Sequence, residues 1–201
     1  LIKGLKLIVE GDSNDYVGKS LSGGKIIVKT SKKSNLISKD NVIIGNTVLY
    51  GATAGKLYAS GQAGERFAVR NSGSLAVVEG CGAHGCEYMT GGNVIIIGPV
   101  GDNFGAGMTG GMAFIYDPEN NFENFVNPVS IIWQKVETEH WKNFLKNNLE
   151  DFLKETNSET AKVILDNYEK EILNFKQICP IEMLDKLDNP ITFKNIVKKV
   201  S

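Results

Sequence analysis

The sequence is poor in side chains that commonly carry catalysis, and it lacks segments that direct proteins into membranes. It contains two histidines and three cysteines, and the odd cysteine count argues against a secreted, disulfide-linked framework. No apolar run approaches the ~18 residues that a transmembrane helix needs, and the N-terminus lacks the layout of a signal peptide. We therefore expect an intracellular protein, cytoplasmic or organellar. Because the first residue is Leu1 rather than methionine, we also expect a processed product or a segment of a longer chain.

A basic excess is missing as well. The chain has 22 Lys and Arg residues against 23 Asp and Glu residues, and neither half, divided at Val136, is strongly basic. Proteins that bind nucleic acids usually carry a basic patch that neutralises phosphates. The composition therefore argues against a nucleic-acid partner.

Glycine, in contrast, is abundant and recurs at a fixed period. The tetrapeptide Met-Thr-Gly-Gly occupies residues 89–92 and again residues 108–111, and each copy leads into an apolar run. Related units upstream extend the series, and the register glycines of all units are Gly24, Gly55, Gly73, Gly92 and Gly111. Their spacings are 31, 18, 19 and 19 residues. A fixed period of this kind indicates stacked structural units.

A unit of 18 or 19 residues has the length of one coil of a parallel β-solenoid, in which short strands alternate with turns. Glycine suits the corners of such coils because it adopts positive φ without steric cost. The spacing of 31 corresponds to one coil plus an insertion. The excess falls on the Lys-, Ser- and Asn-rich residues 30–41, which predict a solvated loop.

Two solenoid types compete for this pattern. Several glycines lie six residues apart, as in the left-handed hexapeptide β-helix of acyltransferases, but the drift of the period from 18 to 19 breaks that phase. The sequence therefore favours an all-β solenoid of the other type, a right-handed single-stranded parallel β-helix, followed by a C-terminal helical appendage.

The glycine-rich region closes at a strong turn signal in residues 117–121. We assign the β-helix to residues 1–136 and the helical appendage to residues 137–201. Residues 129–136 can form one last strand, whose Trp133 is a candidate for covering the open end of the coils, since solenoids need such caps.

Two helices are predicted in the appendage. Apolar side chains recur at helical spacing in its first part: Trp141, Phe144, Leu145, Leu149, Phe152 and Leu153. A second helix is predicted for residues 158–175, where Ile164, Tyr168 and Ile172 line one face. Such stripes are more typical of packing than of a cofactor site. We expect the appendage to dock on the coils or on a partner domain.

Residues 80–85 match the dinucleotide fingerprint G-x-G-x-x-G and follow an apolar run. The fingerprint binds a pyrophosphate only where a helix starts at its third glycine, so that the helix N-terminus faces the phosphates. Residues 86–92 cannot open a helix of useful length. We therefore interpret the segment as a solenoid corner rather than a nucleotide site.

The same segment contains Cys81, His84 and Cys86, a group that suggests metal binding or a thiolate nucleophile. A structural zinc site wants four ligands, and neither Cys179 nor His140 lies in a motif that completes one. A catalytic pair of one cysteine with His84 would also need a third residue to orient the histidine, and none is evident from the sequence. Cysteine on a coil is more often a small buried apolar residue. We assign no catalytic, cofactor-binding or metal-binding residue to this chain.

Two arginines, Arg66 and Arg70, could form bidentate contacts with carboxylates near the coil corners. The candidate carboxylates are Glu10, Asp12, Asp15, Glu79 and Glu87. We interpret these groups as structural ion pairs rather than as a substrate site. Arg66, Arg70 and Glu87 are also candidates for holding the domain to its neighbours.

The glycine-rich region carries many short motifs in one order. They include Gly-Asp at 11–12, Asn-Asp-Tyr-Val-Gly-Lys at 14–19, Leu-Ser-Gly-Gly at 21–24, Leu-Tyr-Gly-Ala-Thr at 49–53, Ala-Gly-Glu-Arg-Phe at 63–67, Val-Arg-Asn-Ser-Gly at 69–73 and His-Gly-Cys-Glu-Tyr-Met-Thr-Gly-Gly at 84–92. In this order they resemble the C-terminal GXGXG domain of the glutamate synthase large subunit. The tail resembles that family through Thr-Asn-Ser at 156–158 and Ala161, whereas Cys81 departs from its pattern.

The resemblance implies a right-handed parallel β-helix within an enzyme that converts glutamine and 2-oxoglutarate into two glutamates. It also implies that the amidotransferase nucleophile, the FMN site and the iron–sulfur cysteines lie in other domains. The β-helix would then be a non-catalytic scaffold without a cofactor of its own. Its implied partners are those domains of the large subunit and a small NAD(P)H-oxidising subunit. The alternative is a free-standing β-helix protein, or a subunit of another oxidoreductase such as formylmethanofuran dehydrogenase, whose fold it also resembles.

Overall fold

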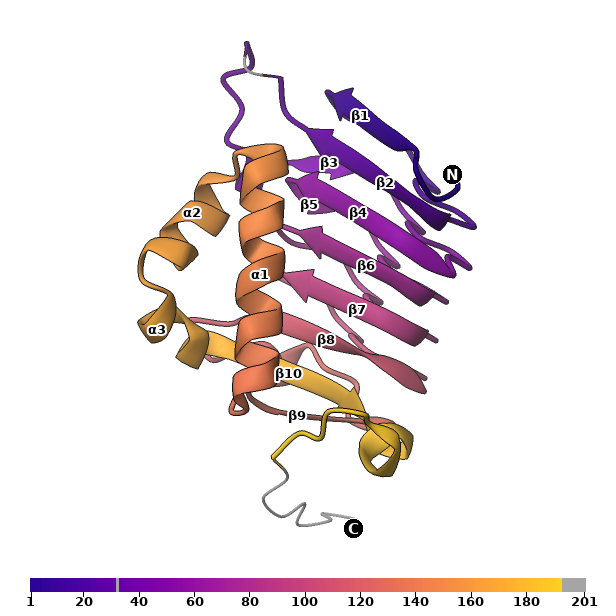
Figure 1. The fold of residues 1–201 in the computed structure, drawn as a ribbon, viewed down its shortest axis with the longest axis vertical. Helices are drawn as coiled ribbons and strands as arrows, with labels where there is room; N and C mark the ends of the chain where they lie inside the picture. Colours follow the sequence, from indigo (N-terminus) through magenta and orange to yellow (C-terminus); the bar gives the residue numbers. More distant parts are fainter. Residues whose placement is uncertain (32, 193–201) are drawn as a thin grey trace.

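The structure, a computed structural model, describes residues 1–31 and 33–192 and is built on a parallel β-solenoid of about six turns (Figure 1). Each turn contributes one strand to the main sheet. The parallel strands are, in order, β1 (Lys6–Glu10), β2 (Ser22–Lys29), β4 (Ala54–Ser60), β6 (Ser72–Val78), β7 (Thr90–Ile96) and β8 (Gly110–Tyr116). The predicted β-solenoid is confirmed.

A second side of the coils is formed by very short strands and single bridges. Strand β3 (Val42–Ile44) pairs in parallel with β5 (Gln62–Ala63), and the bridge from Cys81 to Val100 continues this side. The predicted insertion lies between β2 and β3. It ends in the 3-10 helix η1 (Ser38–Asp40), and most of its described residues are exposed; Lys32 lies outside the described residues.

The third side of the coils has a backbone conformation that the sequence did not reveal. Three residues at alternate positions of each coil have positive φ, between +52° and +74°: Tyr16, Gly18 and Ser20; Thr47, Leu49 and Gly51; Arg66, Ala68 and Arg70; His84, Cys86 and Tyr88; Asn103, Gly105 and Gly107. Most of them are not glycine, and the left-handed conformation costs such residues roughly 1–2 kcal/mol each. Hydrogen bonds to neighbouring coils offset this cost, such as the 2.7 Å bond from the Cys86 amide to the Phe67 carbonyl of the preceding coil.

The register glycines have two different roles. Gly55, Gly92 and Gly111 have the predicted positive φ, of +97°, +83° and +78°, but they lie in the first residues of β4, β7 and β8, where the sheet register shifts, and not at corners between strands. Gly24 and Gly73 do not have positive φ, so the prediction was wrong for them. Gly73 is required by close approach instead, because a Cβ there would lie 2.0 Å from the Thr53 carbonyl oxygen.

Inward-facing aliphatic side chains stack in register to fill the solenoid. One such column is Ile26, Leu57, Ala76, Val94 and Ala113, all of them buried. The opposite face of the main sheet is apolar too, with a buried column of Ile27, Tyr58, Val77, Ile95 and Phe114. That outer face needs a cover.

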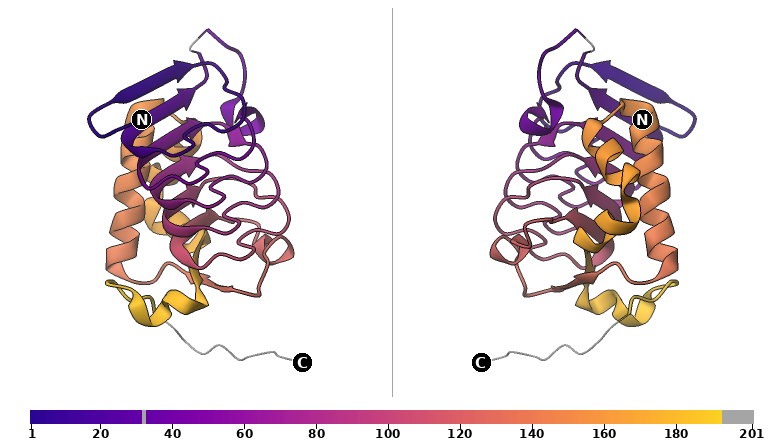
Figure 2. Two further views of the ribbon diagram at one scale, coloured as in Figure 1. Left: turned by 90° about the vertical axis from the view of Figure 1, so that its right-hand side faces the viewer. Right: turned by 90° about the vertical axis from the view of Figure 1, so that its left-hand side faces the viewer.

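Helix α1 (Glu139–Thr156) is the cover, and it runs across the outer face of the strands (Figures 1 and 2). Its predicted apolar stripe is confirmed, since Trp141, Leu145, Leu149 and Phe152 are buried. The rings of Tyr58 and Phe152 meet edge to face, with centroids 5.7 Å apart. Burying large aromatic and aliphatic side chains of this kind contributes roughly 1.5–3 kcal/mol each.

The predicted second helix is interrupted. Helices α2 (Glu159–Asp166) and α3 (Tyr168–Glu171), with the 3-10 turn η3 (Ile172–Asn174), take its place, and Asn167 separates α2 from α3. The predicted apolar face survives the break, because Ile164, Tyr168 and Ile172 are all buried in the cluster beneath α1.

The appendage is not purely helical. Strand β10 (Phe175–Pro180) enters the main sheet antiparallel to β8, and β9 (Ile131–Lys135) pairs with its other edge. The predicted boundary at residue 136 therefore cuts across one sheet. The 3-10 helices η2 (Phe122–Asn124) and η4 (Ile181–Lys186) lie at the same end. Trp133 on β9 packs against Phe122 and the solenoid interior, which confirms its predicted place at the end of the coils.

Among the helices of the described residues, none combines the length and the hydrophobicity that a membrane-spanning segment needs.

Candidate functional site

The segment that imitates a dinucleotide fingerprint is a coil corner. Residues 83–88 are turn residues on the third side of the solenoid, and the next regular element is strand β7. Gly85 is needed for packing, because a Cβ there would lie 2.8 Å from the Phe104 ring. The interpretation of this segment as a corner is confirmed, since the chain continues from it into a strand and not into a helix.

The cysteines of this segment are interior residues. Cys81 and Cys86 belong to the buried cluster inside the coils, and Cys179 lies in β10 on the other side of the sheet. Burial raises the pKa of Cys81 to about 12 and of Cys86 well above its usual value, so both remain protonated thiols. Thiolates are what nucleophilic attack and metal binding require. In the described part of the chain, no three His, Cys, Asp or Glu side chains are grouped so that they could hold a metal ion.

His84 is one member of a polar ladder across neighbouring coils. Its Nδ1 lies 3.0 Å from Nδ2 of Asn103, whose own Oδ1 accepts a 2.7 Å hydrogen bond from Asn127. The Glu87 carboxylate lies 3.6 Å from the same His84 Nδ1. This arrangement holds His84 by its Nδ1 and links successive coils.

The predicted bidentate contacts of the arginines with carboxylates are not formed within the described residues, where Arg66 approaches one carboxylate and Arg70 contacts an aromatic ring instead. Arg66 Nε lies 3.7 Å from Oε2 of the buried Glu87, and the Arg70 guanidinium lies 5.9 Å from the centroid of the Tyr88 ring. The Tyr88 ring in turn packs over Gly107, where a Cβ would come within 2.5 Å of it. The remaining candidate carboxylates are dispersed: Glu10 lies 3.9 Å from Lys29, Asp15 accepts a bond from the Asn46 amide, and Asp12 follows β1.

Glu79 is the one candidate carboxylate that is fully buried, and it joins the solenoid to helix α2. It accepts a short hydrogen bond from the hydroxyl of Ser158, which also caps α2 by accepting from the Ala161 amide. Its other oxygen has no hydrogen-bond partner within the described residues. Burial raises the pKa of Glu79, although the hydroxyls of Ser158, Ser38 and Thr160 oppose that effect.

A cavity of about 500 Å³ lies beside Glu79, at the carboxyl ends of the parallel strands. Its polar wall includes Tyr116 and Asp117. The Asp117 carboxylate accepts from the amides of Asn121 and Phe122, and the Tyr116 hydroxyl donates to Glu171. Asp117 therefore holds the turn after β8, whereas Glu79, which also lines the cavity, has one oxygen without a hydrogen-bond partner within the described residues.

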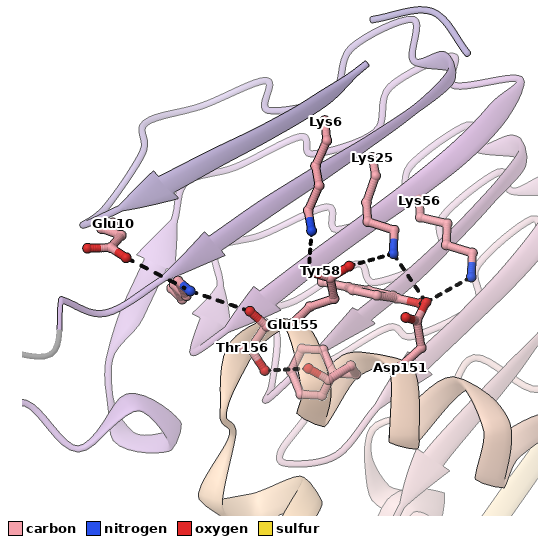
Figure 3. Close-up of polar contacts among 10 residues, drawn as sticks. Lys6, Glu10, Lys25, Lys56, Tyr58, Asp151, Glu155 and Thr156 are labelled. Atoms are coloured by element: carbon pink, nitrogen blue, oxygen red, sulfur yellow. Dashed lines mark hydrogen bonds and ion pairs between the residues drawn. The ribbon is translucent and has the colours of Figure 1, made fainter. Parts of the chain in front are cut away.

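One polar network was not predicted from the sequence, and it ties α1 to strands β1, β2 and β4 of the main sheet (Figure 3). Lys6, Lys25 and Lys56 occupy the same register position on β1, β2 and β4. Neighbouring strands lie only ~4.8 Å apart, so three stacked ammonium groups repel one another. Two carboxylates one helical turn apart on α1, Asp151 and Glu155, face this lysine ladder.

Each carboxylate binds more than one lysine. Glu155 contacts Lys6 and lies 2.8 Å from Lys25 Nζ, while Asp151 lies 3.0 Å from Lys56 and 3.4 Å from Lys25. The buried Tyr58 donates a 2.7 Å hydrogen bond to the same Asp151 oxygen. The helix that covers the sheet thus places two carboxylates against the three ammonium groups of the ladder and reduces their repulsion.

The protonation equilibria follow from these contacts. Partial burial opposes ionisation of Asp151, but the hydrogen bonds from Tyr58 and Lys56 and the nearby lysine charges outweigh it and lower the pKa to about 2. Hydrogen bonds from Lys25 and Lys6 lower the pKa of Glu155. Burial and the bond to Asp151 raise the pKa of Tyr58. Both carboxylates are ionised at neutral pH.

A signal for this network exists in the sequence. Lys6, Lys25 and Lys56 are spaced by 19 and 31 residues, which are the same intervals that separate the glycine units. Residues in phase with the solenoid period stack on one face. The carboxylates that pair with these lysines, Asp151 and Glu155, could not be identified without knowing how α1 docks on the sheet.

Comparison with known proteins agrees with this geometry. The family described as GXGXG motif matches residues 1–181. The chain belongs to this family. Over 94% of its length it is 55% identical to the glutamate synthase [NADPH] large chain of Azospirillum brasilense, covering 12% of that protein. It is 49% identical over 89% of its length to the ferredoxin-dependent glutamate synthase of Antithamnion sp., covering 12%. It is 44% identical over its whole length to the glutamate synthase [NADH] of Schizosaccharomyces pombe, covering 10%.

This GXGXG chain spans about a tenth of the length of those relatives, as a domain of the kind found in glutamate synthases. The expected resemblance is confirmed. The described residues do not fit an iron–sulfur cluster, because the three thiols are buried, have raised pKa values and lie on both sides of one sheet.

Proposed function

We propose that this GXGXG domain is a non-catalytic structural part of a glutamate synthase, the enzyme that forms two glutamates from glutamine and 2-oxoglutarate. Its role is to pack against the amidotransferase domain and the domains that hold FMN and the iron–sulfur cluster. The observation that carries the proposal is the use of its buried and half-buried ionisable groups. The lysine ladder, Glu79 and Glu87 all connect one element of the domain to another.

The comparisons support the same proposal. Relatives whose names state NADPH, NADH or ferredoxin share this region with the chain at 44–55% identity. Since the region is similar in enzymes named for different electron donors, we propose that it does not select the donor. A small NAD(P)H-oxidising subunit, FMN and the iron–sulfur cluster then belong to other parts of the enzyme. The proposal includes an intracellular location, cytoplasmic or organellar.

The test is a kinetic comparison in a full-length glutamate synthase large chain that carries these residues. His84→Ala and Asn103→Ala alter neighbouring members of the same ladder, and only His84 has acid–base chemistry. For a structural domain, kcat and KM for glutamine and 2-oxoglutarate should stay within about two-fold of the parent in both variants. A tenfold fall in kcat for His84→Ala alone, in a protein that melts like the parent, would overturn the proposal.

A further inference from the structure

The contacts within the domain use only half of the Glu79 carboxylate. Glu79 directly follows strand β6 and is completely buried. Its Oε1 accepts a hydrogen bond from the Ser158 hydroxyl, whereas its Oε2 has no hydrogen-bond partner within the described residues. Buried polar atoms are normally paired, and a carboxylate oxygen is one of the most costly groups to leave unpaired. The unpaired Oε2 therefore points to a hydrogen-bond donor that comes from outside the described residues.

The neighbours of Glu79 do not supply this donor. The hydroxyls of Ser38 and Thr160 lie close enough to oppose the rise of the Glu79 pKa by burial, but neither donates a hydrogen bond to Oε2. Lys39, in the 3-10 helix η1, acts on Glu79 through its charge without a hydrogen bond. A glutamine would satisfy Ser158 equally well, so the contact with α2 does not explain why a carboxylate is buried here.

The space beside Glu79 has the size of a site for a small molecule. Glu79 lies in the wall of the cavity of about 500 Å³ at the carboxyl ends of the parallel strands. The apolar part of the same wall includes the buried side chains of Ile97, Ile115 and Phe122. Small-molecule sites are commonly cavities of about 300–1,000 Å³ with mostly apolar walls and a few polar groups. The cavity can therefore accommodate an aliphatic chain next to the unpaired oxygen.

The charges of the wall favour a cation. Besides Glu79, the carboxylates of Asp40, Asp117 and Glu119 line the cavity, and Lys39 is the one basic residue of the wall among the described residues. Asp117 accepts from two amides of the turn after β8 and lies 3.8 Å from Lys176, whereas Asp40 and Glu119 are exposed. A concave surface with an excess of one charge attracts ligands of the opposite charge. This excess of carboxylates disfavours an anionic ligand.

The type of cation follows from the groups present. In the described part of the chain, no three His, Cys, Asp or Glu side chains are grouped so that they could hold a metal ion. An alkyl ammonium group, in contrast, needs only hydrogen-bond acceptors, because it offers three N–H donors on an aliphatic stem. The unpaired oxygen and the apolar wall match these two parts of an amine.

We propose that this cavity binds a small aliphatic diamine or polyamine. One ammonium group donates to Glu79 Oε2, and the alkyl chain lies against the apolar wall. A second ammonium group lies near the exposed carboxylates of Asp40 and Glu119. This inference goes beyond the proposed function, because it gives the domain a ligand of its own. The ligand stabilises the domain, since it supplies the donor that the buried carboxylate lacks and fills the space between the strands and α2.

Calorimetric titration tests the proposal in a full-length glutamate synthase large chain that carries these residues, with 1,4-diaminobutane as the probe. Low ionic strength is used because salt screens the attraction. We expect a Kd of about 1 mM or tighter for the diamine and weaker binding of butylamine, which has one ammonium group. 1,4-Butanediol has the same length and no charge, and it should not bind. Absence of diamine binding up to ~10 mM, or equal binding of the diol, would overturn the proposal.

Glu79→Gln assigns the binding to this cavity. Its amide oxygen can still accept from Ser158, but its NH₂ group then replaces the oxygen that accepts from the ligand. The Kd of 1,4-diaminobutane should rise at least about tenfold, and the diamine should no longer raise the melting temperature. Glu150→Gln is the matched control, because Glu150 is an exposed carboxylate on α1, and its Kd should stay within about two-fold of the parent. An unchanged Kd in Glu79→Gln contradicts the proposal.

A second variant covers the case in which Glu79→Gln does not fold. Ile97→Phe narrows the cavity from the side of the sheet and keeps the carboxylate, so it should also weaken binding of the diamine by about tenfold or more. Parent-like binding in a folded Ile97→Phe protein would place the diamine elsewhere and overturn the proposal. The kinetic test of the structural role uses His84 and Asn103, which do not line this cavity, so the two conclusions can fail separately.

Discussion

Tyr58 on β4 donates a 2.7 Å hydrogen bond to Asp151 on α1, from strand to helix across 93 positions of sequence. The contact places a buried hydroxyl and a carboxylate at the centre of the lysine ladder. It also aligns α1 along the sheet, because Phe152, the next residue, meets the Tyr58 ring edge to face. Packing and electrostatic contacts at Tyr58 thus hold helix α1 in place on the sheet.

Asp151→Asn should destabilise the protein by roughly 1–2 kcal/mol at neutral pH, since it removes the charge that Lys56 and Lys25 share. Thermal unfolding measures the effect. Asp166→Asn is the matched control, because Asp166 forms an exposed pair with Lys162 one helical turn away and should contribute at most about 0.5 kcal/mol. Equal losses for the two variants would contradict a special role for the ladder.

Acid should weaken the same contact. The folded-state pKa of Asp151, about 2, lies below its usual value, so its stabilising effect is present at neutral pH. The effect is lost as pH falls from the usual aspartate range of about 4 through pH 2. The difference in melting temperature between the parent and Asp151→Asn should therefore shrink over that interval. A difference that stays constant from pH 7 to pH 2.5 would show that Asp151 acts through packing alone.

Glu79 predicts the opposite pH dependence. Burial raises its pKa, so the folded protein holds this proton more tightly and loses stability as pH rises from the usual glutamate value through the raised one. Glu79→Gln keeps an acceptor for Ser158 and removes the buried charge. Its melting temperature relative to the parent should rise between pH 4 and pH 8. A variant whose relative stability falls over this range would indicate that the ionised form is the favoured partner of α2.

The three cysteines should be inert in the folded protein. Cys81, Cys86 and Cys179 are buried, and burial raises the pKa of each thiol, to about 12 for Cys81 and about 11 for Cys179. Titration with a chromogenic disulfide reagent at pH 8 should detect no thiol before unfolding and all three in denaturant. Fast labelling of a single cysteine in the native state would contradict the buried assignment.

The fold could be predicted from the sequence because its period is global. A repeat of 18 or 19 residues determines a stack of coils whatever the local propensities are. The third side could not be predicted, because residues such as Arg66 and Ala68 are left-handed on account of hydrogen bonds to neighbouring coils, not of intrinsic preference. Strand β10 was hidden for the same reason, since its six residues become a strand only by pairing with β8 and β9.

The candidate site divided in a similar way. Cys81 and Cys86 were interpreted correctly, because a cysteine on a coil is usually a small buried apolar residue. The contact of Glu79 with Ser158 spans 79 positions and depends on where α2 docks, which no periodicity encodes. The lysine ladder is an intermediate case. The spacing of its three lysines follows the repeat and is visible in the sequence, whereas their partners Asp151 and Glu155 could not be predicted.

Alanine substitutions at three glycines can distinguish two causes of destabilisation, the strain of positive φ and a steric clash of the added Cβ. Gly51 has φ of +65°, and a Cβ added there would meet no atom within 4 Å, so Gly51→Ala should cost about 1 kcal/mol through strain alone. Gly73 lacks positive φ, but its Cβ would lie 2.0 Å from the Thr53 carbonyl oxygen, so Gly73→Ala should cost more by forcing two coils apart. Gly111 combines φ of +78° with a contact of 2.6 Å to the Gly92 carbonyl oxygen, so Gly111→Ala and Gly111→Val should destabilise most. Thermal unfolding of the set gives the order, and a Gly73→Ala protein as stable as the parent would show that the coils can separate without loss.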